Sequence, residues 1–80
     1  MRWRSPRVGK LPVLSGAELV SLLEKNGFLV VRQRGSHTSL QKGDYRTVVP
    51  LHDELAKGTL LAILKQCGLS REELEKMTRK

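Results

Sequence analysis

Apolar residues recur at helical spacing between residues 15 and 27, with polar residues at the intervening positions. Ser15 and Glu18 have the spacing of a capping box, in which each side chain hydrogen-bonds a free amide of the first turn. Asn26 and Gly27 favour the left-handed conformation that ends a helix. The pattern predicts an α-helix that begins after Ser15 and ends at Asn26-Gly27.

Three β-rich segments follow, separated by short turns that contain glycine. The predicted strands are residues 28–33, 37–41 and 45–49, and the predicted turns are Arg34-Gly35-Ser36 and Lys42-Gly43-Asp44. Pro50 closes the last strand because it has no amide proton for a sheet hydrogen bond. Connections this short join antiparallel neighbours, so the sequence predicts a three-stranded meander.

Two more helices are predicted after the strands. Thr59 is the expected N-cap of a helix that continues through Cys67 and ends at Gly68. Ser70 and Glu73 repeat the capping-box spacing and begin a short C-terminal helix. The sequence therefore predicts an α+β fold in the order α-β-β-β-α plus that C-terminal helix, with the two main helices on one face of a three-stranded antiparallel sheet.

Alternation along the second strand predicts the position of His37. Thr38 and Leu40 share one face of the strand, whereas His37, Ser39 and Gln41 share the other. Leu40 is the only large apolar residue of this strand, so its side should face the helices. We therefore expect His37 to be accessible to solvent on the open face of the sheet.

The formal net charge of the 80-residue chain is +7, and four basic residues without an acid lie in its first ten residues. Residues 1–14 lack periodicity, which divides the chain into a basic N-terminal arm, residues 1–14, and a folded domain, residues 15–80. A basic chain favours polyanions such as nucleic acid, and Trp3 could stack on a base. A solvated tail accounts for this charge equally well.

Cys67 is the only cysteine, so no disulfide framework exists and a reducing compartment is expected. No signal peptide is visible, because no apolar segment follows the basic start. The longest apolar runs, FLVV and LLAIL, are too short to cross a bilayer. These features predict a cytoplasmic protein without membrane contact.

The segment RQRGSHTSLQ carries the candidate chemistry. An imidazole exchanges its proton near neutral pH, so His37 could move the protons of ribonucleolysis. Gly35 would let a substrate backbone come close. Arg32, Arg34 and Arg46 could bind phosphate and stabilise the charge of a phosphorane. A single histidine beside a turn is more often structural, so the residue pattern alone leaves both roles open.

Other polar residues also have two possible roles. His52 could be a second proton-transfer group or could fix the loop before the second main helix. Ser36 could orient the imidazole or only hold the turn, and the same applies to Thr38. Lys57 could contact a phosphate at a helix N-terminus or be solvated.

A metal site could be assembled from His37, His52, Asp53 and Cys67, but their spacing matches no zinc pattern. Cys67 also belongs to an apolar helical stripe. We therefore expect no metal and no other cofactor.

An ordered set of short motifs resembles the HicA toxins of bacterial type II toxin–antitoxin systems, which are small ribonucleases that cleave messenger RNA. The motifs are Ser-Gly before the first helix, Asn-Gly-Phe, Gly-Ser-His, Val-Pro-x-His, Lys-Gly-Thr-Leu and Gly-Leu-Ser. The resemblance covers about residues 11–77. It implies a fold like that of double-stranded-RNA-binding domains, metal-independent chemistry, and His37 as the active-site residue. It also implies a HicB-type antitoxin that binds the toxin and covers His37.

These observations predict an mRNA interferase with His37 as the catalytic residue and His52 and Ser36 as possible auxiliary residues. The residues expected to bind RNA are Arg32, Arg34, Arg46 and Lys57. One alternative is a non-catalytic module that binds double-stranded RNA through the same fold. Another is a domain that binds only protein, whose RNA affinity would lack steep salt dependence.

Overall fold

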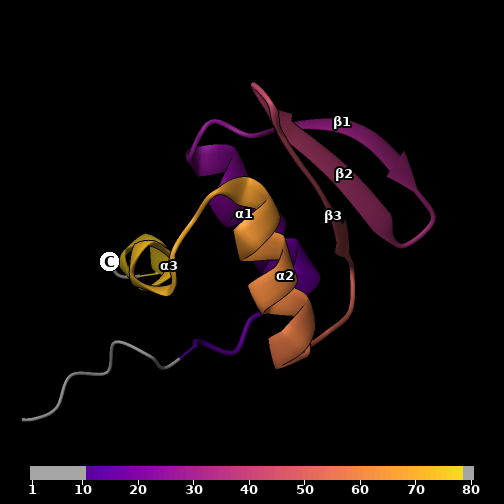
Figure 1. Ribbon diagram of the computed structural model, residues 1–80. Helices are drawn as coiled ribbons and strands as arrows, with labels where there is room; N and C mark the ends of the chain where they lie inside the picture. Colours follow the sequence, from indigo (N-terminus) through magenta and orange to yellow (C-terminus); the bar gives the residue numbers. More distant parts are fainter. Residues whose placement is uncertain (1–10, 79–80) are drawn as a thin grey trace, which may run out of the picture.

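The computed structural model describes residues 11–78, which form three helices and one three-stranded antiparallel sheet (Figure 1). The elements are α1 (Gly16–Lys25), β1 (Leu29–Arg34), β2 (His37–Lys42), β3 (Tyr45–Pro50), α2 (Lys57–Cys67) and α3 (Arg71–Thr78). The strand order is β1-β2-β3, and α1 and α2 lie together on one side of the sheet. The predicted α+β fold and its order of elements are confirmed.

Both hairpins turn through two residues, the first of which is a glycine at positive φ. Gly35 has φ 57° between the paired residues Arg34 and His37, and Gly43 has φ 60° between Lys42 and Tyr45. A two-residue loop with glycine in its first position matches the right-handed twist of the flanking strands. Arg34, which the sequence prediction left in the turn, therefore belongs to β1.

The core lies between the helices and the inner face of the sheet. Its most deeply buried side chains include Leu19, Leu23, Leu40, Val49, Leu60 and Leu74. Thr38 is buried beside Leu40, as the alternation of β2 predicted. Leu14 is also buried, although its position in the sequence suggested the arm. Residues 1–10, with Trp3 and the arm's basic residues, lie outside the described part of the chain.

Two of the three predicted N-caps are found at the starts of the helices. The capping box at Ser15 and Glu18 forms, with hydrogen bonds of 2.8 and 3.1 Å, and the box at Ser70 and Glu73 also forms. The prediction that Thr59 caps the second main helix is wrong. The helix α2 begins at Lys57 with Ala56 as its N-cap, and the Leu60 amide donates to the Ala56 carbonyl across a first turn that already contains Thr59.

The first turn of α1 packs against the end of β3, at a contact we call the junction: Gly16, Ser36 and residues 50–52. The Gly16 amide donates to the His52 carbonyl at 2.9 Å, and the Leu51 amide donates to the Ser36 carbonyl at 2.6 Å. A Cβ atom at position 16 would overlap the Pro50 carbonyl oxygen and lie 2.8 Å from Leu51 Cα. Only glycine permits this approach.

The thiol of Cys67 lies in the core, as its place on the apolar stripe predicted. Thr47, on the inner face of β3, donates a hydrogen bond of 2.7 Å to the Gln66 side-chain oxygen. Burial raises the pKa of Cys67 to about 11, and a hydrogen bond with Thr47 opposes part of this rise. The sulfur therefore stays protonated and poorly nucleophilic in the folded protein at neutral pH.

We predict that Gly16→Ala destabilises the protein by about 1–3 kcal/mol, the usual cost of forcing extra atoms into a packed site. Gly58→Ala is the matched control, because Gly58 also lies in the first turn of a helix but has no atom within 4 Å of the place that an added Cβ would take. The control should be neutral or more stable. Urea unfolding followed by circular dichroism gives both free energies of unfolding. Equal stability of the two variants would contradict the tight packing at the junction.

We also predict that a disulfide reagent modifies Cys67 at pH 8 only as fast as the protein unfolds. Ser36→Cys adds an exposed thiol in the first hairpin turn and should react at once.

The raised pKa of Cys67 also makes stability depend on pH, since the native state holds a thiol proton that the unfolded state loses above pH 9. The free energy of unfolding should fall between pH 9 and pH 11, and Cys67→Ala should remove that part of the decline.

Candidate functional site

The open face of the sheet consists of three cross-strand rows, because directly paired residues of antiparallel strands share a face. The rows are Arg34-His37-Pro50, Arg32-Ser39-Val48 and Leu29-Gln41-Arg46. We call these nine residues the open face. All of them are exposed or half-buried, whereas their strand neighbours Thr38, Leu40, Thr47 and Val49 are buried under the helices.

The open face is positively charged and has no acidic residue. Arg32, Arg34 and Arg46 lie on it, and all three side chains are exposed. No aspartate or glutamate occurs in β1, β2 or β3. Guanidinium groups on a sheet face without an acidic residue attract polyanions, and phosphate is the group whose geometry the guanidinium fork matches.

His37 is the first residue of β2 and follows directly on the Gly35-Ser36 turn. Its side chain is exposed, which confirms the position predicted from alternation. Within the described residues, no hydrogen bond occupies the imidazole. No atom lies within 4 Å of the place a Cβ at Gly35 would take, so the backbone beside His37 is open to a ligand.

His52 lies at the same end of the sheet as His37, two residues beyond Pro50, the residue paired with His37. Its backbone carbonyl accepts the Gly16 amide, so the loop that carries it is held by the start of α1. Its side chain is exposed. The structure therefore gives His52 a structural backbone contact and leaves its imidazole free to act, so both predicted roles remain compatible with its position.

The other two predicted site residues take different positions. Ser36 is exposed next to His37, and its carbonyl accepts the Leu51 amide. Lys57 is exposed at the start of α2, a helix that packs against the inner face of the sheet. The structure thus places the three arginines on the same face of the sheet as His37 but does not bring Lys57 onto that face.

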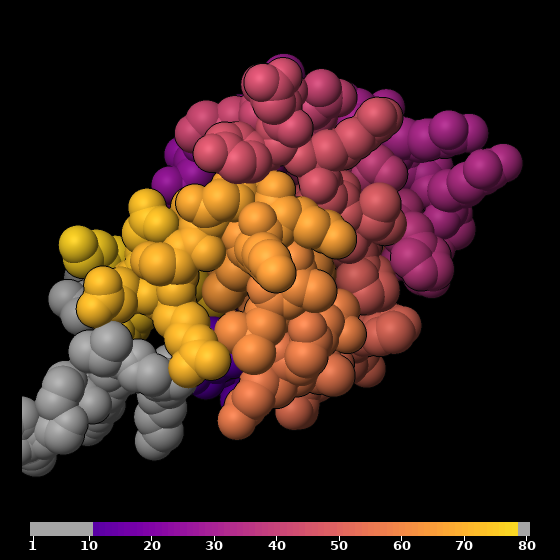
Figure 2. Space-filling view, in the orientation of Figure 1, coloured from indigo at the N-terminus to yellow at the C-terminus, as the bar shows by residue number. Residues whose placement is uncertain are grey.

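Sequence reasoning missed the apolar part of the open face and the contact of Lys42 with the end of α1. Leu29 is 69% and Val48 is 46% exposed, because only one face of the sheet is covered by helices. Figure 2 shows β1, in purple, projecting beyond the helices in orange and yellow. Lys42 is not part of the open face, since its Nζ donates to the Asn26 carbonyl at 2.8 Å and lies 5.8 Å from the centroid of the Phe28 ring. Alternation along the predicted strand 45–49, which puts Val48 on the face opposite to Thr47 and Val49, was the available signal for the exposed valine.

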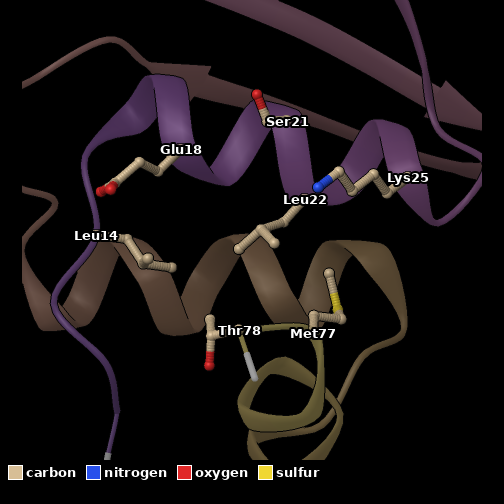
Figure 3. A pocket seen from close by; sticks show the side chains of 7 residues that line it. All are labelled: Leu14, Glu18, Ser21, Leu22, Lys25, Met77 and Thr78. Atoms are coloured by element: carbon tan, nitrogen blue, oxygen red, sulfur yellow. The ribbon is translucent and has the colours of Figure 1, made fainter. Parts of the chain in front are cut away.

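A groove on the helical side is separate from the open face. Leu14, Leu22 and Met77 form its apolar lining, and Glu18 and Lys25 also line it between α1 and α3 (Figure 3). None of the predicted site residues reaches it. Within residues 11–78, no group of three or more His, Cys, Asp or Glu side chains could hold a metal ion. No helix of that part is long and apolar enough to cross a membrane.

Comparison with known proteins identifies the family of the chain. Residues 16–69 match the family model described as "HicA toxin of bacterial toxin-antitoxin", which covers more than half of the chain. No curated protein and no solved structure matches the chain significantly. The match confirms the resemblance found in the sequence motifs and implies an antitoxin partner. The chain therefore belongs to the HicA toxin family of bacterial toxin–antitoxin systems.

Proposed function

We propose that the protein is an mRNA interferase, a toxin that cleaves messenger RNA with His37 as its proton-transfer group. The main support is the composition of the open face: one exposed imidazole in the same cross-strand row as an arginine, on a surface with two further arginines and no acid. Membership in the HicA toxin family makes RNA the polyanion to test first.

The proposed reaction transfers the phosphate from one ribose oxygen to another. Neutral His37 takes the proton of a 2′-hydroxyl, whose oxygen then attacks the adjacent phosphorus. The bond from phosphorus to the 5′-oxygen breaks, and that oxygen gains a proton. The products are a 2′,3′-cyclic phosphate and a 5′-hydroxyl. The charge on the phosphorane oxygens is balanced by a guanidinium group of the open face.

Two protons move on opposite sides of the phosphorus, so a second group is needed beside His37. His52 is the proposed donor, because the junction holds it at the same end of the sheet as His37 and leaves its side chain exposed. Ser36, next to His37, is proposed to orient the imidazole or the phosphate. Lys57 is proposed as a more distant contact to RNA that extends past the open face.

The proposed protein partner is a HicB-type antitoxin that covers His37. The positive charge of the open face favours an acidic partner surface, and the partner would also bury exposed apolar groups such as Leu29 and Val48. The principal alternative is a double-stranded-RNA-binding module without catalysis, which needs the arginines but not the imidazole. Its support is the α-β-β-β-α order of elements.

We predict that His37→Ala lowers the rate of RNA cleavage by at least about 10²-fold, the usual contribution of a general acid–base group. RNA binding and the thermal unfolding midpoint should stay close to wild type, since the side chain is exposed. Gln33→Ala is the matched control, because Gln33 is an exposed residue of the same hairpin that pairs with Thr38 on the inner face. Cleavage of a labelled messenger RNA and growth after induction measure the effect.

Analysis of product ends gives an independent check of the chemistry. Cyclic phosphate and 5′-hydroxyl ends are expected. Products with 5′-phosphates would contradict the proposed attack by the 2′-hydroxyl. Unchanged cleavage by His37→Ala, or no cleavage by the wild-type protein despite tight RNA binding, would favour the binding module.

A further inference from the structure

The three arginines of the open face differ in their distance from His37. Arg34 pairs directly with His37, so their Cβ atoms are about 4.5–5.5 Å apart. Arg32 lies in the next row, about 7 Å along the strand. Arg46 pairs with Gln41, four residues from His37 and therefore about 13–14 Å away along β2, on the opposite edge of the sheet.

The Gly35-Ser36 turn sets this order. A two-residue loop requires the residues on either side of it to be paired, which are Arg34 and His37. The same loop leaves open space at Gly35, where a nucleic acid backbone can approach both side chains. A phosphate within hydrogen-bonding distance of the His37 imidazole is thus within reach of the Arg34 guanidinium but not of Arg46.

We propose that Arg34 is a catalytic residue that contacts the scissile phosphate, whereas Arg32 and Arg46 bind phosphates farther along the RNA and contribute to affinity alone. This inference rests on the proposed ribonuclease function. As the phosphorane forms, negative charge grows on its non-bridging oxygens. Two N–H groups of one guanidinium can donate to two of these oxygens, and that contact strengthens as the charge increases.

The same geometry defines a path for the substrate. Arg34 and Arg32 lie in successive rows on β1, and their separation is similar to that of neighbouring phosphates in an extended RNA strand. The backbone of the substrate would then follow β1 from the turn toward Leu29, with the scissile phosphate at Arg34 and the adjacent phosphate at Arg32. Leu29 and Val48 offer apolar surface for the bases beside this path.

Steady-state cleavage of one defined oligoribonucleotide tests this division of roles. We expect Arg34→Ala to lower kcat by about 10²–10³-fold, the effect of removing one preorganised donor from a transition state. Arg32→Ala and Arg46→Ala should raise KM and leave kcat within about threefold of wild type, because the contacts they remove are the same in substrate and transition state. Arg34→Lys should recover only a small part of the lost kcat, since an ammonium cannot make the paired contact.

Binding of a non-cleavable analogue, with a 2′-deoxy nucleotide at the cleaved position, supplies the control. Each of the three alanine variants removes one phosphate contact and should reduce the salt dependence of affinity by a similar amount, a slope change of about 1. The catalytic role of Arg34 is supported if all three variants lose RNA affinity equally and only Arg34→Ala loses kcat. All three arginines are exposed, so each variant should keep the wild-type fold, and its thermal unfolding midpoint checks this.

Two failures can be told apart. If Arg34→Ala changes only KM, as Arg46→Ala does, while His37→Ala abolishes cleavage, the role of Arg34 is overturned and the ribonuclease function stands. If His37→Ala cleaves at the wild-type rate, the proposed function itself is wrong.

Discussion

The junction between α1 and the end of β3 is the constraint on which the candidate site depends. Gly16 lets the first turn of α1 contact Pro50 and Leu51, and its amide donates a hydrogen bond to the His52 carbonyl. The Leu51 amide donates to the carbonyl of Ser36, the residue before His37. The helical layer, the loop of His52 and the turn beside His37 are therefore joined by a chain of backbone contacts, so the backbone that carries both histidines is tied to the packing of the buried Gly16.

Having all helices on one side of the sheet determines what the other side can do. The inner face holds the core, including Leu40 and Val49, and among residues 11–78 no further layer covers the outer face. Arginines on a bare face repel one another unless an anion lies among them, and no carboxylate from the strands meets this need. An uncompensated cationic surface contributes little to folding, and its presence is consistent with the proposed role in binding the phosphates of RNA.

The edge strand β1 shows how function and stability conflict in this fold. Its six residues are all exposed, and it carries Leu29, Val30 and Val31 in sequence. Exposed apolar edges favour pairing with other chains. The irregular register between Val30 and Arg32 and the charge of the arginines oppose such pairing. An antitoxin that covered this strand together with His37 would remove both the proposed catalytic group and the exposed apolar surface from solvent.

The sequence by itself determined those features that depend on residues close together in the chain. The capping boxes at Ser15 and Ser70, the glycine turns and the side of β2 on which His37 lies all follow from local patterns, and each is found in the structure. The family motifs are equally local. The fold class and the exposure of the candidate catalytic residue could therefore be predicted before any contact was known.

Only the tertiary structure decided the features that join distant segments. The register between β2 and β3 left Arg46 two rows away from His37, although in the sequence Arg34 and Arg46 appeared as equivalent cations. Packing drew Leu14 into the core and began α2 before Thr59. It also separated Lys57 from the arginines. These outcomes depend on contacts between segments that are distant in the sequence, and a pattern within a few residues does not specify such contacts.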